Sequence, residues 1–203
     1  MKTFIAIPCM DEFDVSFMQS FIGLMSVGEV KKGIVSGSLI YEARERLALS
    51  AVQNESDYCL WLDSDMVFEP TLLLDLIKHE KDMVCGLYCA RRPPYSPSLF
   101  IDVNKDGKIG AKTVRDVPDH LFEVDACGMG ALLVKTEILA KCFDTYETCF
   151  QPIRGYGEDI SFCIRARELG YKLWCDPSVK VGHIGKTIIT YDTYKEFNDA
   201  IKG

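Results

Sequence analysis

The chain has 203 residues, of which 48% are hydrophobic and 26% charged, as is ordinary for one soluble globular domain with a sizeable core. Its net charge of −7 argues against a nucleic-acid partner, because phosphate binding needs a basic surface. No apolar run approaches the length of a membrane span, and residues 3–9 are too short for a secretory signal. We therefore expect a cytoplasmic protein without a membrane span.

Strands and helices alternate over the first ninety residues. Apolar runs predict strands at residues 3–7, 30–35, 58–62 and 83–88. Helical spacing and start signals predict helices after Asp14, from Ser38 to about Asn54, and from Pro70 through Ile77. Such alternation indicates an α/β fold with a largely parallel sheet.

Shorter strands follow from Arg91 onward. Residues 91–97 contain three prolines and cannot form a helix or a central strand. Two arms of a hairpin are expected at 99–103 and 108–114, and further strands at 122–126, at 131–134 and on both sides of Asp176-Pro177, the last ending at His183. Helices are expected at 136–142, from 158 to a stop at Gly170, and in the tail from Tyr191. We predict one domain over 1–203, with a mostly parallel central sheet and a small antiparallel hairpin part.

Nine cysteines are scattered along the chain, and no two of them form a Cys-x-x-Cys pair. Most fall in predicted strands or helices. We expect them to be reduced, small residues of the core.

Asp63-Ser64-Asp65 directly follows the apolar run Tyr58–Leu62. Paired aspartates are common in surface turns, but a run this apolar predicts a strand buried on both faces. Open α/β sheets bind ligands at the carboxyl ends of their strands. Two adjacent carboxylates repel each other unless a cation intervenes, and oxygen ligands suit Mg²⁺ or Mn²⁺ holding substrate phosphates.

Gly157-Glu158-Asp159 begins a predicted helix. Acidic residues there can simply complement the helix dipole, or one carboxylate can act as a general base toward an acceptor hydroxyl. His183 stands at a strand end between glycines. A lone histidine is more often a packed or solvated residue than a ligand, although imidazole is a good Mn²⁺ ligand beside carboxylates.

Two further patterns imitate known sites. Residues 102–109 match the first half of a calcium-binding loop, but Thr113 stands where a bidentate Glu is required, so a hairpin turn through 104–107 is favoured. Gly128 and Gly130 lack the third glycine and the helix of a dinucleotide-binding fingerprint.

Taken in order, these pieces resemble the GT-A glycosyltransferases, especially the family-2-like members of bacteria and phages. The resemblance runs from about Thr3 to Gly185. The stretches that carry it are Ile5–Pro8, Gly37–Arg44, Trp61–Met66, Val124–Gly130, Gly157–Phe162 and His183–Gly185. It implies a GT-A, Rossmann-like fold with a nucleotide-binding half at 1–90, an acceptor and catalytic half at 91–185, and a tail at 186–203.

The resemblance also implies residue roles. Asp65 and His183 would ligate Mn²⁺ or Mg²⁺, Asp63 would contact the ribose or the metal, and Asp159, with Glu158 beside it, would be the catalytic base. Arg44 would lie near the nucleotide, although Glu45 stands where Asn is usual. The remaining donor-binding candidates are Pro8, Cys9 and Met10 at the base, Ser64 beside Asp63, and Gly128, Met129 and Gly130 bordering the sugar and the acceptor.

The implied activity is metal-dependent hexosyl transfer from a nucleoside diphosphate sugar to an unidentified acceptor hydroxyl. A UDP-sugar is the first choice of donor and a GDP-sugar the second; the stereochemical outcome is open. The chain is short for this family, so a partner or a very simple acceptor site would make up the difference, and a homo-oligomer is one option.

Two alternatives stay open. A sugar nucleotidyltransferase normally has a glycine-rich loop with a basic residue after the first strand, which Pro8-Cys9-Met10-Asp11 lacks. A non-catalytic nucleotide-binding protein of the same fold would bind nucleotide without turnover.

Overall fold

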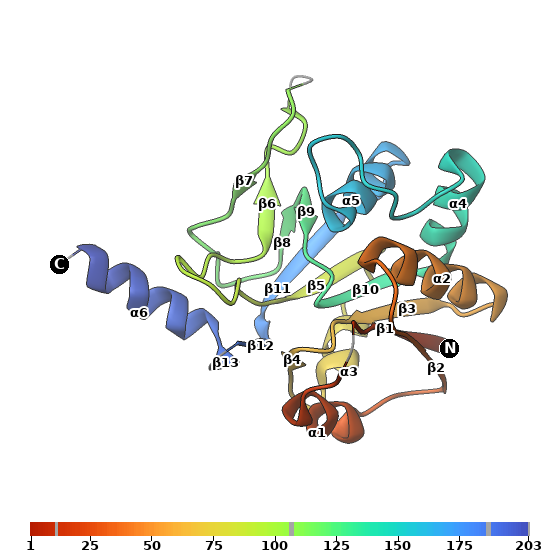
Figure 1. The fold of residues 1–203 in the computed structure, drawn as a ribbon, viewed down its shortest axis with the longest axis horizontal. Coiled ribbons are helices and arrows are strands. Elements are labelled where there is room, and N and C mark those ends of the chain that lie inside the picture. Colours follow the sequence, from red (N-terminus) through yellow and green to blue (C-terminus); the bar gives the residue numbers. More distant parts are fainter. Residues whose placement is uncertain (11, 106–107, 186–187, 203) are drawn as a thin grey trace.

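A seven-stranded sheet runs through the middle of the molecule, and helices cover both of its faces (Figure 1). The computed structural model describes residues 1–10, 12–105, 108–185 and 188–202. Helices α2, α4 and α5 pack on one face of the sheet, and α1 and α3 pack on the other. The helix bounds are α1 Val15–Gly23, α2 Ile40–Gln53, α3 Leu72–Ile77, α4 Thr136–Tyr146, α5 Glu158–Glu168 and α6 Tyr191–Lys202. This architecture confirms the predicted α/β class.

The central sheet is mixed. Its strand order is β2-β1-β3-β10-β5-β11-β8. The pairs β1–β2, β1–β3 and β5–β11 are parallel, as predicted for this fold, whereas β10 runs antiparallel between β3 and β5, and β8 runs antiparallel to β11. The bounds are β1 Lys2–Pro8, β2 Glu29–Val35, β3 Tyr58–Leu62, β5 Met83–Leu87, β8 Phe122–Val124, β10 Ala131–Lys135 and β11 Leu173–Lys180.

Two small antiparallel sheets lie beside the central one, with the orders β7-β6-β9 and β13-β12-β4. Strands β6 and β7 form the predicted hairpin, and the carboxylate of Asp102 pairs with Lys105 and Lys112. Within the predicted turn, Asp106 and Gly107 lie outside the described residues, as does Asp11 in the loop after β1. The bounds are β4 Met66–Val67, β6 Leu99–Ile101, β7 Lys112–Thr113, β9 Ala126–Cys127, β12 Gly182–Ile184 and β13 Ile188–Ile189.

Some element boundaries differ from the prediction. Leu39, not Ser38, precedes the first turn of α2, so the Ser38 hydroxyl lies one position too early to cap it. Helix α3 begins at Leu72, two residues after Pro70. The strand predicted at 122–126 is split, because β8 joins the central sheet and β9 a small one. Strand β11 continues through Asp176-Pro177 and is interrupted only by an irregularity in its pairing with β5.

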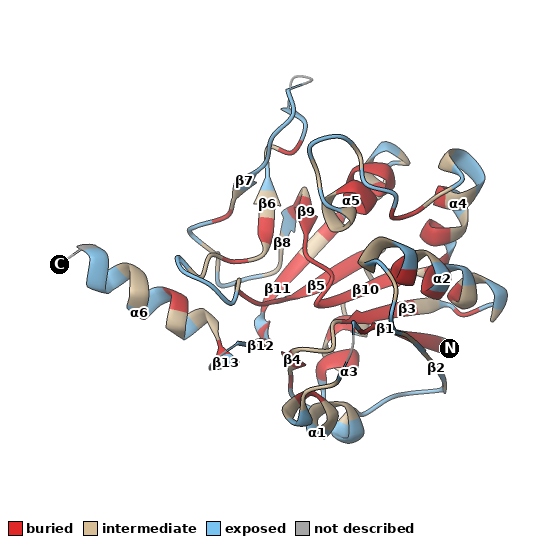
Figure 2. Cartoon of the chain, viewed as in Figure 1, coloured by how far each residue is buried: buried red, intermediate tan, exposed pale blue. Residues whose placement is uncertain are grey.

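The core is formed by both faces of the central sheet (Figure 2). Four of the five residues of β3 are fully buried, because α2 covers one face and α1 and α3 cover the other. All nine cysteines are buried and free, which confirms the prediction of reduced core residues. No helix among the described residues is long and apolar enough to cross a membrane.

One edge of the central sheet gathers the residues of interest. Strands β1, β3, β5 and β11 run in the same direction, because β3 and β5 both pair antiparallel with β10. Their carboxyl ends therefore meet at one edge. The loops that follow carry Met10, Asp63 to Asp65, Arg91 and, in β12, His183.

Candidate active site

Two adjoining hollows open at this edge of the sheet. A cleft of about 1020 Å³ lies between the loop after β1, the segment 91–95 and Ile184. A smaller pocket of about 180 Å³ lies next to it and includes Arg44 and Asp63. Met10, Ser64 and Asp65 line both hollows, so the two are continuous at the end of β3.

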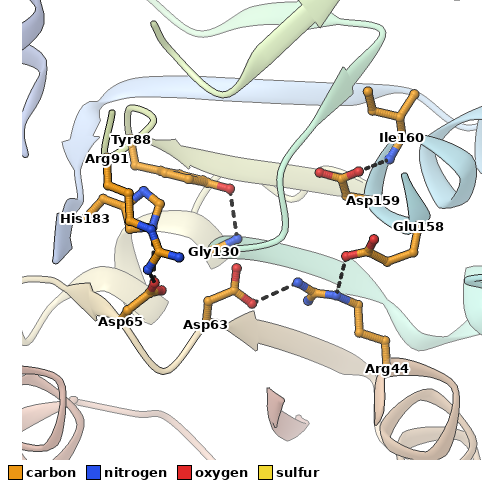
Figure 3. Close-up of polar contacts among 10 residues, drawn as sticks. All are labelled: Arg44, Asp63, Asp65, Tyr88, Arg91, Gly130, Glu158, Asp159, Ile160 and His183. Atoms are coloured by element: carbon orange, nitrogen blue, oxygen red, sulfur yellow. Dashed lines mark hydrogen bonds and ion pairs between the residues drawn. The ribbon is translucent and has the colours of Figure 1, made fainter. Parts of the chain in front are cut away.

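Asp65 receives two cationic partners on one oxygen. Its Oδ2 lies 3.2 Å from Nε2 of His183 and 2.8 Å from Nη1 of Arg91 (Figure 3). Burial works to raise the pKa of Asp65, but His183 and Arg91 outweigh it and hold that pKa below its usual value. Asp65 is therefore ionised at neutral pH, and its carboxylate is surrounded by the cationic groups of Arg91 and His183.

The protonation of His183 is fixed on one side of its ring. Nδ1 lies 2.9 Å from the carbonyl oxygen of Cys89, which can only accept, so Nδ1 carries a proton. In a neutral ring, Nε2 would then face the Asp65 carboxylate with a lone pair. Burial works to lower the pKa of His183, but Asp65 overcomes this effect and raises it. The pair is therefore stable either as imidazolium and carboxylate or with another cation between them.

This donor set fits a divalent metal. A histidine that donates its other ring N–H to a backbone carbonyl is typical of metal ligands, and a carboxylate beside it suits Mn²⁺ or Mg²⁺. The described part of the chain contains no group of three or more His, Cys, Asp or Glu side chains arranged to hold a metal. Asp65 and His183 are thus brought together, whereas Asp63 pairs with an arginine instead.

Arg44 of α2 is the cationic centre of the smaller pocket. Its side chain is buried, with Nη2 2.9 Å from Oδ1 of Asp63 and Nε 3.4 Å from Oε1 of Glu158. Burial works to lower the pKa of Arg44, but Asp63, Glu158 and then Asp159 outweigh it and raise that pKa. Nη1 is buried and has no hydrogen-bond partner among the residues that the structure describes.

Asp159 stands at the start of α5, close to Glu158 and apart from Asp65 (Figure 3). Oδ1 accepts a hydrogen bond from the backbone N–H of Ile160 at 2.7 Å. Burial, followed by the neighbouring charge of Glu158, raises the pKa of Asp159 above its usual value. A carboxylate with a raised pKa is a better proton acceptor near neutral pH.

The loop after β1 contributes unequally to the pocket. Pro8 and Met10 line the smaller hollow together with Ile40. Cys9 is buried, its thiol lies 3.2 Å from the carbonyl oxygen of Glu12, and it lines neither hollow. The structure thus places two of the three predicted base-binding residues at the pocket.

The glycines of Gly128-Met129-Gly130 serve the packing of Tyr88. A Cβ atom at Gly128 would overlap the Tyr88 hydroxyl, and one at Gly130 would lie 3.0 Å from the ring of the same tyrosine. The backbone N–H of Gly130 donates to that hydroxyl at 3.2 Å, and Met129 is buried in the core. None of these three residues lines the two hollows, so their assignment to the sugar and acceptor stays a prediction.

Arg91 and Tyr88 lie at the site and were not identified from the sequence. Arg91 contacts Asp65, and Tyr88 lies between Gly130 and the ring of His183. A usable signal was present for Arg91, because it follows β5, whose carboxyl end lies at the same sheet edge as Asp63 and Asp65. Tyr88 is the last residue of the apolar run 83–88, so the sequence gives no comparable signal for it.

Comparisons with known proteins support the fold described above. The Anp1 family model matches residues 36–96, a stretch that contains Arg44, Asp63, Asp65 and Arg91. The fold is similar to that of A197 from STIV, with a TM-score of 0.66, 20% sequence identity and 94% of each chain covered. Comparison with curated protein sequences gives no match.

The fold is also similar to that of GalNAc-T7, crystallised with UDP, GalNAc and Mn²⁺, with a TM-score of 0.59 and 12% identity. This match covers 91% of the present chain but 43% of GalNAc-T7, so the chain spans less than half of that protein. The fold is thus GT-A-like, and the resemblance to GT-A glycosyltransferases is confirmed.

Proposed function

We propose that the protein is a metal-dependent glycosyltransferase that moves a sugar from a nucleoside diphosphate sugar to an acceptor hydroxyl. The observation that carries the proposal is the pair Asp65–His183, of which Asp65 lines both the cleft and the smaller pocket. Its protonation pattern leaves a position for a cation beside an ionised carboxylate. A diphosphate needs such a cation, because its charge must be neutralised as it leaves.

The two hollows divide the donor between them. The smaller pocket offers a nucleoside the side chain of Arg44 and the apolar side chains of Met10 and Ile40. The cleft offers a diphosphate the guanidinium groups of Arg91 and Arg92. A UDP-sugar is our first choice, supported by the similar fold of GalNAc-T7 with its UDP, and a GDP-sugar is the second.

Asp65 and His183 would hold Mn²⁺ or Mg²⁺, with Asp63 as a further ligand or a contact to the ribose. When bound, the metal would supply Lewis-acid neutralisation of the leaving diphosphate. Arg91, whose guanidinium contacts Asp65, adds a second positive charge next to the proposed metal. The protein thus concentrates its cationic groups where the negative charge of the leaving group grows.

Asp159 is the candidate base. In an inverting transfer it would take the proton of the acceptor hydroxyl, while the oxygen bonds to the anomeric carbon and the bond to the diphosphate breaks. Its raised pKa suits this role. Glu158 is ion-paired with Arg44, so it is less available for the same task.

The test is thermal stability of the purified protein with UDP, GDP, CDP and TDP, each with and without Mn²⁺, followed by transfer and donor-hydrolysis assays. A ligand that binds only the native state raises its stability. We expect one nucleotide to give a Mn²⁺-dependent shift that is lost in Asp65→Ala, and the matching donor to be turned over. Binding without turnover across acceptors would favour the non-catalytic alternative. No shift with any nucleotide would contradict the proposed site.

A further inference from the structure

Glu45 departs from the pattern of the resembling family, and the structure shows what it does. Its carboxylate accepts three hydrogen bonds from the segment 148–150, which lies more than a hundred residues further along the chain. Phe150 N–H lies 2.8 Å from Oε1, Cys149 N–H lies 3.1 Å from Oε2, and the Thr148 hydroxyl bonds Oε1. An Asn, with a single acceptor oxygen on a shorter side chain, could not make this set.

The segment held by Glu45 leads directly to the candidate base. The guanidinium of Arg165 in α5 holds the carbonyl oxygens of Cys149 and Gln151 at 2.9 and 2.7 Å. The Ser161 hydroxyl accepts from Ile153 N–H and donates to the Gly157 carbonyl. From Thr148 to Gly157 the chain is therefore anchored to α2 at its start and to α5 along its length.

Phe150 connects this segment to the donor side. Its ring is fully buried and lies 5.0 Å from the ring of Trp61 in β3, edge to face. It also stacks on Phe162 of α5, again at 5.0 Å between centroids. Trp61 stands two residues before Asp63. Phe150, whose backbone Glu45 holds, therefore packs between β3 and α5 and helps to set the distance between them.

We infer that Glu45 is a positioning residue for the transfer step. By fixing the 148–157 segment, it sets the distance between Asp159 and the carboxylates of Asp63 and Asp65. The inference rests on the proposed function. Glu45 lines neither hollow and would not touch the donor. Its neighbour Arg44 contacts Asp63 and Glu158, so two consecutive side chains of α2 position both halves of the site.

The variants are Glu45→Ala, which removes all three acceptors, and Glu45→Gln, which keeps one acceptor oxygen. Glu42→Ala, an exposed glutamate one turn earlier on α2, is the matched control. Three quantities are measured: hydrogen exchange of the 148–157 amides, Mn²⁺-dependent nucleotide affinity by calorimetry, and kcat and KM for donor turnover.

We expect Glu45→Ala to exchange the amides of Cys149 and Phe150 at least tenfold faster and to lower kcat about tenfold to a hundredfold, since small misplacements of reacting groups cost this much. Nucleotide affinity and donor KM should stay within twofold of the wild type. Glu45→Gln should be intermediate, and Glu42→Ala unchanged. This rescue by the conservative variant separates positioning from loss of folding.

Faster exchange with unchanged kcat, or unchanged exchange in Glu45→Ala, would overturn this inference and leave the proposed function standing. An equal loss of nucleotide affinity and kcat would also overturn it, because Glu45 would then support the whole site. If the wild type bound nucleotide but turned over no donor, the proposed function would fail, and the positioning role would fail with it.

Discussion

Asp65 and Asp159 are two aspartates of one site in opposite electrostatic surroundings. Asp65 lies against Arg91 and His183, and these cations outweigh burial to lower its pKa. Asp159 is half-buried with Glu158 beside it, and its pKa is raised. Groups whose surroundings push their pKa values apart are suited to different chemical tasks. The region around Asp65 is suited to hold cation and phosphate, and the region around Asp159 to accept a proton.

Arg44 stands between these two regions. It neutralises Asp63 on one side and Glu158 on the other, and Asp159 has no ion pair among the described residues. This arrangement keeps three carboxylates close together while only one of them is left free to take up a proton. The difference between the regions is therefore a property of how α2 is placed, and substitutions can break it at either end.

Substitution of Asp65 should have the largest effect. Asp65→Ala removes the anionic partner of His183 and the carboxylate for the metal, whose contribution to the transition state is several kcal/mol. We expect turnover to fall about a thousandfold and the Mn²⁺-dependent nucleotide binding to be lost. Calorimetric titration with Mn²⁺ and with nucleotide measures the second effect directly.

Asp119→Asn, at an exposed aspartate in the loop before β8, is the control and should leave both quantities unchanged. Metal-dependent nucleotide binding that survives in Asp65→Ala would show that the cation-rich region does not hold the metal.

Asp159→Asn should affect only the region around Asp159 and lower turnover without weakening donor binding. Loss of a general base typically costs about a hundredfold or more in kcat, whereas Asp159 lines neither of the two hollows proposed for the donor. We expect kcat to fall by that factor, with the affinity for nucleotide and Mn²⁺ within twofold of the wild type. Full turnover in this variant would contradict the assignment of the base. Glu168→Gln, exposed near the end of the same helix, serves as the control.

Local sequence patterns predicted the elements that carry Asp65 and Asp159. The apolar run of β3 fixes a buried strand whose end presents Asp63 and Asp65, and glycine followed by acidic residues predicts the start of α5. Each of these signals lies within about ten consecutive residues. The elements were therefore predictable from the sequence, and the resemblance ordered them into one fold.

The contacts that distinguish the two regions were not predictable in the same way. Arg44 meets Glu158 across 114 positions, and Glu45 meets the 148–150 segment across a similar span. Which side chains meet depends on strand order, and β10 enters antiparallel between β3 and β5.

Removal of Arg44 should leave the carboxylates of Asp63 and Glu158 without their cationic partner. Breaking a buried ion pair by deleting one partner costs about 3–5 kcal/mol, but Asp63 and Glu158 still reach solvent, which reduces the cost. We expect Arg44→Met to lower the free energy of unfolding by about 2 kcal/mol, as a shift of the urea midpoint at constant slope.

Arg46→Met, at an exposed arginine of the same helix, should change stability by less than about 0.5 kcal/mol. Equal midpoints for the Arg44 and Arg46 variants would show that the carboxylates do not need Arg44 as a partner.

The smallest expected effect concerns stability at Asp159 itself, and it has the opposite sign to the effect on activity. The folded pKa of Asp159 is raised above its unfolded value, mainly by burial, so its ionised form costs stability at neutral pH. Asp159→Asn carries no such charge and keeps an oxygen for the Ile160 N–H. We expect the variant to be more stable than the wild type by roughly 0.5 kcal/mol at neutral pH.

The gain should shrink as the pH falls through the raised folded pKa, because the native wild type then takes up a proton before the unfolded chain does. It should vanish below the unfolded value of about 3.9, where Asp159 is protonated in both states. Urea midpoints of the two proteins at a series of pH values measure this difference. A variant less stable than the wild type at neutral pH would show that Asp159 contributes to the fold as an ionised group. The contrast with Asp65, whose lowered pKa makes its ionised form stabilising, would then disappear.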